Sequence, residues 1–333
     1  MIIDVFNHFM PKPYLDRLEQ LIPDHVAVKA FPRLATLVDV EARLRLLDQF
    51  DGVQQVLSLA NPPLELVSSR DTTPELARIA NDALAEICRK HPQAFPTFIA
   101  ALPMNNMDAT LAETRRAIRE LGARGVQVFT NVAGMPLSLP EFRPLFRLMA
   151  ELDLPVWVHP MRGPNFADYA SEMHSEDEIW FSFGWPYETT ACMTRLIYSG
   201  LFDELPNLKI ISHHMGGMIP YFSGKIKLGF RQIFFGTPER NPVAEEHGLK
   251  KPPIEYFQML YADTALGGEE APTRCGHAFF GTSRCLFATD APFDSEQGRG
   301  LIADTIRGIR SLRLSSDETD RIFAGNARDL LRL

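Results

Sequence analysis

The chain has 333 residues, of which 45% are hydrophobic and 23% charged, the balance of a globular enzyme. A chain of this length buries enough surface to hold a rigid site without disulfides. The formal net charge is −8 and no basic stripe is interleaved with aromatics, which argues against a nucleic-acid partner. No window approaches 18 apolar residues, so we expect no membrane partner.

The four cysteines suggest a reducing compartment. Cys88, Cys192, Cys275 and Cys285 never form a CxxC pair, so neither a disulfide framework nor a cysteine-based zinc site is expected. The start of the chain has no basic segment and reaches an acid at Asp4, unlike a signal peptide. We therefore expect a cytoplasmic protein.

Eight short apolar runs recur along the chain. Each is continuously apolar rather than alternating, which is typical of a strand covered on both faces in a parallel sheet. In chain order they are Ile2–Phe6, Val53–Leu59, Phe95–Ala101, Val126–Thr130, Leu154–Val158, Leu208–Ser212, Phe257–Ala262 and Cys285–Thr289.

Helical patterns fill the gaps between these runs. Pro74–Lys90 repeats its apolar residues with a period of 3.6, with Thr73 as a plausible N-cap. Asp108 is expected to cap the next helix, and Glu41–Phe50 and Leu139–Leu152 have similar patterns. Eight alternations of strand and helix predict an α/β fold, a (β/α)₈ TIM barrel. The runner-up is an open doubly wound sheet, but no GxGxxG follows a strand.

Two gaps are longer than a crossover requires. Residues 161–188 follow the fifth strand and residues 225–255 follow the sixth, and both are rich in Pro, Gly and aromatics. We interpret them as insertions over the barrel mouth or at an oligomer contact. The chain is then a single domain over residues 1–333, and we expect a homodimer.

Polar residues end several of the predicted strands, where such barrels carry out their chemistry. His8 follows the first, His159 the fifth, His213 and His214 the sixth, Asp263 ends the seventh and Asp290 the eighth. A single such histidine is more often structural, and an Asp after a strand is often a helix cap. Together, however, imidazoles and a carboxylate form a ligand set that suits zinc, iron or manganese.

The adjacent histidines of the sixth strand need separating. Neighbouring residues of a strand point to opposite faces, so only one of them faces the barrel mouth. The spacing to Gly216, Gly217 and Pro220 favours His214 as the inward residue.

The ordered motifs resemble the amidohydrolase superfamily, and within it the branch around 2-amino-3-carboxymuconate 6-semialdehyde decarboxylase. The similarity extends along nearly the whole chain and is specific in its order and spacing. The motifs are the segments 3–11 (IDVFNHFMP), 100–104 (AALPM), 125–128 (GVQV), 158–160 (VHP), 188–190 (ETT), 214–217 (HMGG), 261–264 (YADT), 289–293 (TDAPF) and 325–327 (GNA).

This resemblance implies roles for matching residues. His8 and His159 resemble metal ligands, and Asp290 resembles a carboxylate that both binds the metal and carries a proton. His214 resembles the histidine beside the metal, so His214 and Asp290 are the expected catalytic residues. Arg43, with Arg45 as its competitor, resembles the cation that meets a substrate carboxylate.

Position 6 departs from the family pattern, which has His or Glu where this chain has Phe6. Asn7 is a poor substitute, because strand alternation turns it away from His8. Three ligands, His8, His159 and Asp290, still suffice for a catalytic divalent metal, with zinc expected first and manganese as an alternative. The other outcome is a site without metal, working through His and Asp acid–base chemistry alone.

The branch similarity favours a metal-dependent non-oxidative decarboxylase of an aromatic or unsaturated carboxylic acid. The alternatives are a hydrolase of a C–N, C–O or activated C–C bond and, because of Phe6, a metal-free or noncatalytic acid-binding homologue. In the 161–188 segment, Trp180 and His174 are expected to contact a flat acid substrate, together with Phe6 and Arg43. The alternative for these aromatics is packing against the barrel or a second subunit.

Overall fold

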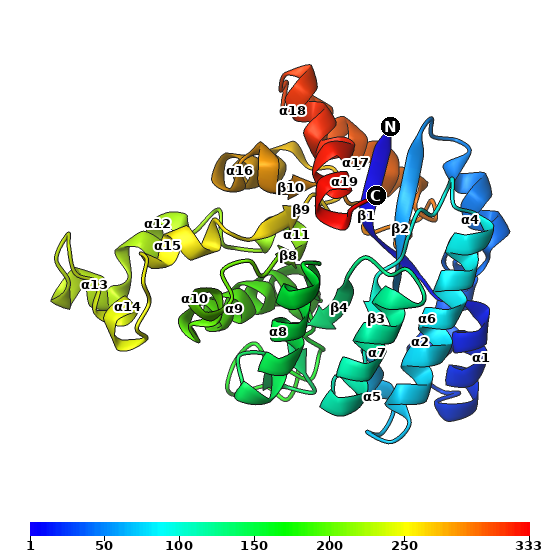
Figure 1. Cartoon of the computed structure of the whole chain (residues 1–333), viewed down its shortest axis with the longest axis horizontal. Coiled ribbons are helices and arrows are strands. Elements are labelled where there is room, and N and C mark those ends of the chain that lie inside the picture. Colours follow the sequence, from blue (N-terminus) through cyan, green and yellow to red (C-terminus); the bar gives the residue numbers. More distant parts are fainter.

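The computed structural model of residues 1–333 is a closed barrel of eight parallel strands (Figure 1). Around the barrel, the strands are β1 (Ile2–Phe9), β2 (Val53–Leu59), β3 (Ala100–Ala101), β4 (Val126–Phe129), β7 (Val156–His159), β8 (Ile210–Ser212), β9 (Tyr261–Asp263) and β10 (Cys285–Leu286). A parallel bridge between Leu57 and Phe98 joins β2 to β3. The Val5 N–H donates to the Phe287 carbonyl and closes β10 on β1. The predicted (β/α)₈ architecture is confirmed.

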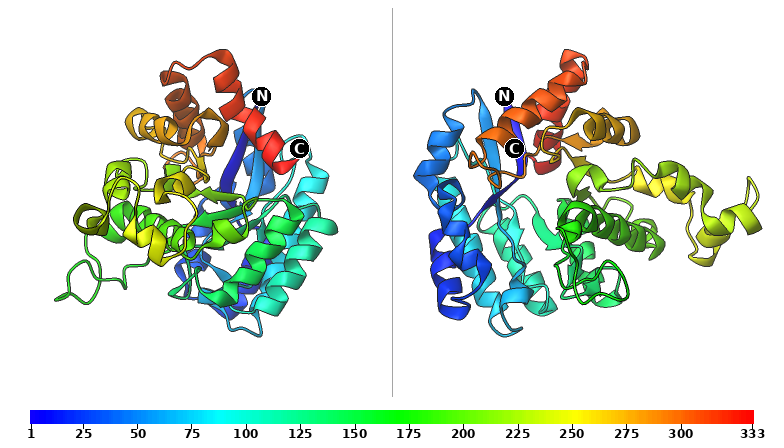
Figure 2. Two further views of the ribbon diagram at one scale, coloured as in Figure 1. Left: turned by 60° about the vertical axis from the view of Figure 1, so that its left-hand side comes forward. Right: turned by 180° about the vertical axis from the view of Figure 1, so that it is seen from behind.

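Helices surround the barrel on its outer side (Figures 1 and 2). The longer ones are α1 (Lys12–Leu21), α4 (Val40–Leu47), α6 (Thr73–Lys90), α7 (Met107–Arg119), α8 (Arg143–Leu152), α9 (Trp185–Tyr198), α16 (Glu270–Phe280) and α17 (Arg299–Ser311). The shorter ones are α2 (Val26–Lys29), α3 (Ala35–Val38), α5 (Leu64–Val67), α10 (Leu201–Glu204), α11 (His213–Gly216), α12 (Ser223–Leu228), α13 (Phe230–Phe235), α14 (Pro242–Glu246), α15 (Pro253–Phe257), α18 (Ser316–Asp320) and α19 (Asn326–Leu331). A small hairpin, β5 (Asn131–Val132) and β6 (Met135–Pro136), follows β4.

The strands are buried on both faces, which explains their continuous apolar character. A large outer cluster packs the strands against the helices. A smaller inner cluster fills the barrel interior, with Ile3, Val56, Ile99, Trp157 and Ile211 contributed by different strands. The barrel is therefore a packed core, and chemistry is confined to its rim.

A β-bulge in β1 sets the direction of the residues that lead to the site. Asp4 pairs with Gln55 and Asn7 with Leu57, so β1 has one more residue than β2 over this stretch. Val5 and Phe6 consequently both join the inner cluster, whereas Asn7 donates outward to the Val56 carbonyl. Bulges of this kind often re-aim side chains beside active sites.

Several predicted boundaries are wrong. Phe257 ends helix α15, and the seventh strand begins only at Tyr261. Asn106, not Asp108, caps α7 by accepting the Ala109 N–H at 3.2 Å. Thr73 lies inside the first turn of α6, and its hydroxyl bonds Asn105 instead of capping the helix. In the last two cases several polar residues stand near the helix start, and sequence alone does not choose among them.

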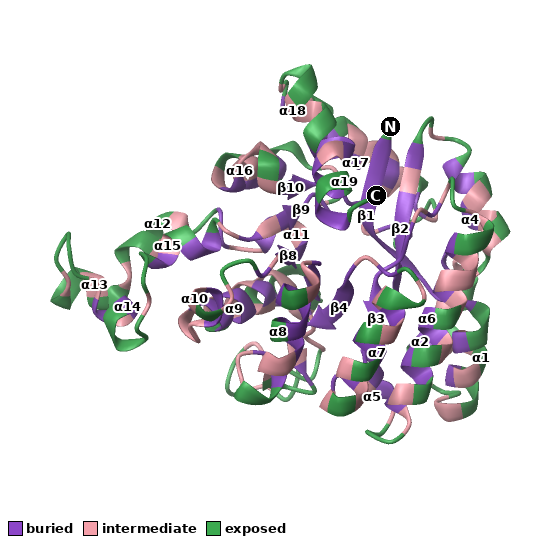
Figure 3. Ribbon diagram, in the orientation of Figure 1, coloured by how far each residue is buried: buried purple, intermediate pink, exposed green.

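The two long gaps differ in the structure. Residues 161–179 contain no helix or strand before a π-helical turn at Trp180–Gly184 leads into α9. Helices α12 to α15 extend from the body as an arm, which is exposed over most of its length (Figure 3). None of the helices combines the length and apolar character needed to cross a bilayer.

Candidate metal centre

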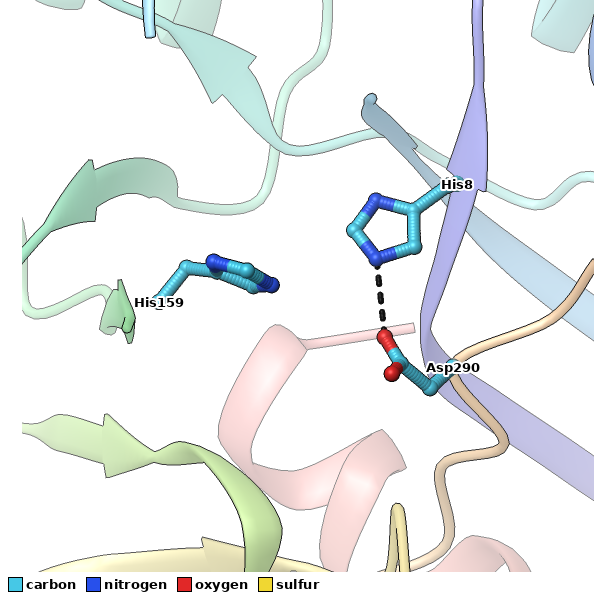
Figure 4. Close-up of side chains that lie close together, drawn as sticks. All are labelled: His8, His159 and Asp290. Carbon is cyan, nitrogen blue, oxygen red and sulfur yellow. Dashed lines mark hydrogen bonds and ion pairs between the residues drawn. The ribbon is translucent and has the colours of Figure 1, made fainter. Parts of the chain in front are cut away.

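Three side chains from distant parts of the chain meet at the carboxyl edge of the barrel. His8, His159 and Asp290 each offer a ligand atom, and these atoms all lie within 4.8 Å of one another. Figure 4 shows the His159 ring directed toward the hydrogen-bonded His8–Asp290 pair. His8 lies near the end of β1, His159 ends β7, and Asp290 follows β10. The strand order thus brings together residues far apart in sequence.

The nitrogen atoms of this cluster are suited to hold a cation. His159 donates its Nδ1–H to the Pro160 carbonyl at 2.7 Å, because that oxygen can only accept. Its buried Nε2 therefore has a free lone pair and no partner. Burial, reinforced by the neighbouring His213 and His8, holds the pKa of His159 well below its usual range, so the ring is neutral. A neutral imidazole held through its other nitrogen is the form that ligates metals.

Asp290 supplies the negative charge of the cluster. Its Oδ1 lies 2.8 Å from His8 Nε2 and its Oδ2 lies 3.5 Å from His214 Nε2. Burial alone would raise the pKa of Asp290, but hydrogen bonds and charge from His214 and His8 hold it well below its usual range. The side chain is 26% exposed, so this carboxylate faces the open side of the cluster. The donor set, two imidazoles and one carboxylate, fits a divalent transition metal.

His214 lies beside the cluster on a strained turn. It has φ 54° and ψ 50°, and Met215 follows with φ 50° and ψ 36°. Each non-glycine residue in this region costs roughly 1–2 kcal/mol, and such strain persists where the surroundings impose it. Burial lowers the pKa of His214, but the Asp290 hydrogen bond and charge outweigh it and leave the pKa above its usual value. Its imidazole can therefore share a proton with Asp290.

His213 points to the opposite side and forms a second, fully buried pair. Its Nδ1 donates to Asp263 Oδ2, and both side chains are 0% exposed. Its Nε2 has no partner, and burial lowers the pKa of the ring. Phe6 lies between the two pairs, with ring centroids 3.8 Å from His213 and 4.8 Å from His8. Position 6 therefore faces the cluster, and a buried phenyl ring occupies it.

Arg43 requires a correction, because it does not reach the open side of the cluster. It is 0% exposed, and its guanidinium donates to the carbonyls of Thr36 at 2.7 Å and His8 at 2.5 Å. A further donation goes to Gln55 at 2.9 Å. All three nitrogens are thus engaged beneath β1, where Arg43 holds the backbone of His8 and cannot meet a substrate carboxylate. Its competitor, Arg45, lies in the last turn of the same helix, α4.

His174 also lies apart from the cluster. Its side chain is 60% exposed and pairs with Glu176 at 3.0 Å. Because the segment around it has no regular structure, its position could not be derived from the strand pattern. The expected contact of His174 with substrate has no support in this arrangement.

Aromatic rings flank the cluster. Trp185, at the start of α9, lies 5.3 Å from His159 and is stacked with His214 at 6.5 Å between centroids. Phe293 lies 5.1 Å from His8 on the other side. The ring of Trp180, the residue expected to stack on substrate, lies 6.0 Å from that of Trp185. The contact of Trp180 with substrate stays a prediction, and Trp185 is the tryptophan that lies directly against His159 and His214.

The fold and the cluster together define a (β/α)₈ barrel with a candidate mononuclear metal centre at the carboxyl ends of its strands. A family model described as amidohydrolase matches residues 57–333. The chain belongs to this amidohydrolase family, which confirms the resemblance drawn from its motifs.

Individual relatives make the comparison narrower. The chain is 32% identical to γ-resorcylate decarboxylase of Rhodococcus jostii (strain RHA1), over 98% of this chain and 93% of the relative. It is 27% identical to 2-amino-3-carboxymuconate-6-semialdehyde decarboxylase of Dictyostelium discoideum, over 99% and 91%. Among solved structures it resembles a dihydroxybenzoic acid decarboxylase from Polaromonas sp. JS666 with bound manganese and the inhibitor 2-nitroresorcinol. That match has a TM-score of 0.81 and 27% identity and covers 100% and 97% of the two chains.

Proposed function

We propose that this protein is a metal-dependent non-oxidative decarboxylase of an aromatic or unsaturated carboxylic acid. The observation that carries the proposal is the open cluster of His8, His159 and Asp290 with His214 beside it. Near full-length similarity to γ-resorcylate decarboxylase supports decarboxylation over the other chemistry that such a cluster permits. Fold alone would not decide between them.

We propose one divalent ion, zinc or manganese, as the cofactor. His8, His159 and Asp290 would hold it, and the unpartnered Nε2 of His159 supports this assignment. When bound, such an ion would act as a Lewis acid and stabilise negative charge on the substrate. The sequence favours zinc as this ion, and the manganese bound in the Polaromonas relative supports manganese as the alternative.

The residues of this chain have three tasks in the proposed reaction. Trp185 and Phe293 lie against opposite members of the cluster and would hold a flat ring by stacking. His214 and Asp290 hold a proton between Nε2 and Oδ2 and would deliver it to the carbon that loses carbon dioxide. The buried Phe6 keeps water from the floor of the site.

Turnover of γ-resorcylate in ¹⁸O-labelled water, by protein reconstituted with zinc or with manganese, tests this proposal. We expect release of carbon dioxide in equal amount to product, with no solvent oxygen in the product. Incorporation of labelled oxygen into the products of amide or ester substrates, with no carbon dioxide released from the acid, would establish the hydrolase alternative instead. Binding of a panel of unsaturated acids without turnover, under either metal, would leave a noncatalytic binder.

Elemental analysis tests the ligand assignment separately. We expect about one transition-metal ion per chain and its loss in His159→Ala. The matched control is His247→Ala, because His247 is an exposed histidine that packs against Tyr198 away from the cluster. Loss of metal in both variants, or in neither, would contradict the assignment.

We also propose that the chain forms a homodimer through the arm of helices α12 to α15. The arm exposes Phe230, Phe234 and Phe235 at 75%, 62% and 65%, an unusual concentration of aromatic surface. Sedimentation should give twice the 37.5 kDa mass of one chain, and replacing the three phenylalanines by serine should halve it.

The cytoplasmic location expected from the cysteines stays a prediction.

A further inference from the structure

The turn that carries His214 needs an external support. His214 and Met215 both have left-handed backbone conformations, and Gly216 and Gly217 continue with φ 75° and 63°. Glycine adopts this region freely, but the two preceding residues do not. Gly217 closes the turn by donating its N–H to the His214 carbonyl at 3.0 Å. This bond holds the end of the turn but not its entry at residues 213 and 214.

Asp263, at the end of the neighbouring strand β9, holds that entry. Its Oδ1 accepts the His214 N–H at 2.9 Å, and its Oδ2 accepts the Nδ1–H of His213. The carboxylate is 0% exposed, so these bonds lie in a medium where water does not compete. One carboxylate therefore holds both the side chain of His213 and the backbone N–H of His214.

The His213 ring makes this grip rigid. Donation from Nδ1 fixes its tautomer, and the ring is buried against Phe6 with 3.8 Å between centroids. Because His213 is held on one side of the backbone, His214 is turned to the other, toward Asp290. The Asp263–His213 pair lies outside the three-residue cluster, since the ligand atoms within 4.8 Å of one another belong to His8, His159 and Asp290.

We propose that Asp263, together with His213, is a positioning element that holds His214 in the left-handed conformation needed to transfer a proton in the reaction. This inference rests on the proposed decarboxylase function. The pair acts through the backbone of His214 and touches neither substrate nor metal. Its loss should impair the chemical step while leaving substrate binding and metal content in place.

Asp263→Asn is the first test, in the metal-loaded protein with γ-resorcylate. The amide keeps the size of the side chain but cannot accept from both N–H groups with two oxygens. We expect kcat to fall about 10- to 100-fold, as for other groups that orient an active-site histidine, with KM and metal content nearly unchanged. An unchanged kcat, or a loss confined to KM, would overturn the inference.

Asp203→Asn is the matched control for general loosening of the fold. Asp203, in α10, also joins two segments through a carboxylate, because it accepts the Tyr256 hydroxyl at 2.6 Å and the Lys250 N–H at 3.1 Å, and it bonds neither His213 nor His214. We expect this variant to keep the wild-type kcat. An equal fall in both variants would overturn the specific role of Asp263.

His213 variants separate positioning from metal binding. In His213→Asn the side-chain amide can replace the Nδ1–H donor, so kcat should stay within a few-fold of wild type, whereas His213→Ala should resemble Asp263→Asn. Loss of metal in His213→Asn would identify the free Nε2 as a ligand and overturn the inference.

A measurement without turnover keeps the two proposals apart. We expect a far-downfield proton signal from the His213 Nδ1–H in wild type and its loss in Asp263→Asn. If wild type lacks that signal, the proposed positioning role of the His213–Asp263 pair is overturned, even if the protein decarboxylates its substrate. A wild type that shows the signal and releases no carbon dioxide contradicts the decarboxylase function instead, and with it the role of the pair in that reaction.

Discussion

Two histidine–aspartate pairs lie on either side of Phe6, and they differ mainly in exposure. His8 and Asp290 are 2% and 26% exposed, whereas His213 and Asp263 are both 0% exposed. The first pair is partly open to solvent, and its ligand atoms lie within 4.8 Å of that of His159. The second pair is buried, and both oxygens of its carboxylate accept hydrogen bonds from N–H groups of the protein. Histidine and aspartate thus form the candidate reactive site in the first pair, whereas in the second pair they have a structural role.

Breaking the open pair should have the largest effect. Asp290→Asn removes the negative charge that His8 and His214 share, so we expect turnover to fall by about 10³-fold or more. Metal content should fall with it, because an amide is a weak ligand. The unfolding midpoint should change little, since the carboxylate is partly exposed. Steady-state kinetics, elemental analysis and calorimetry check the three expectations, and a variant with wild-type turnover would refute the role of this pair.

Phe6→His should sharpen the contrast by adding a donor between the pairs. Position 6 already faces the cluster, with the Phe6 ring 5.6 Å from that of His159. We expect metal to bind about tenfold or more tightly, measured by competition with a chelator. Phe6→Leu is the control, because it changes the size of the side chain without adding a ligand. Equal affinities in the two variants would show that the imidazole does not reach the metal.

Replacing Trp185 should weaken substrate binding at the exposed side of the His8–Asp290 pair and leave the buried pair unaffected. Trp185→Leu keeps an apolar side chain but removes the ring stacked on His214. We expect KM for an aromatic acid to rise about 2- to 10-fold, the range of one lost aromatic contact, with metal content unchanged. Trp180→Leu should have a smaller effect on KM, because Trp180 packs on Trp185 and not on a cluster histidine. A larger rise in KM for Trp180→Leu than for Trp185→Leu would show that Trp180 is the residue that contacts substrate.

Glu65, a half-buried carboxyl outside both pairs, should affect the stability of the fold and not its activity. Burial raises the pKa of Glu65 to about 7, and one of its oxygens has no partner. The folded protein therefore keeps this proton where the unfolded chain releases it, so stability falls as pH rises from about 4.5 to about 7 and is level above. Glu65→Gln should remove that slope and raise the free energy of unfolding by up to about 3 kcal/mol at pH 8, with unchanged kcat. Urea titrations at pH 5 and pH 8 measure it, and an unaltered slope would contradict this assignment.

The strands and the cluster could be predicted because each depends on a local signal. Continuous apolar runs predicted the barrel, and the polar residue that ends each run predicted His8, His159 and Asp290 as neighbours. Arg43 could not be placed in the same way. Its role depends on carbonyl groups of Thr36 and His8, which leave no trace in the pattern of side chains.

The support of His214 was hidden for a similar reason. Alternation predicted that His213 and His214 would diverge, but not that one carboxylate would hold both. Asp263 stood at a strand end like the cluster residues, and only its hydrogen bonds show that both of its oxygens are already engaged. These bonds depend on how a neighbouring strand is placed, and a single sequence does not give that.

The closure of the barrel by β1 and β10 also has a consequence during synthesis of the protein. His8 and Asp290 are 282 residues apart, so the first ligand leaves the ribosome long before the last. At translation rates of about 5–20 residues per second, roughly 15 to 55 s separate them. A nascent chain therefore has no complete metal centre until the eighth strand emerges, and metal capture is expected to be a late, post-translational event.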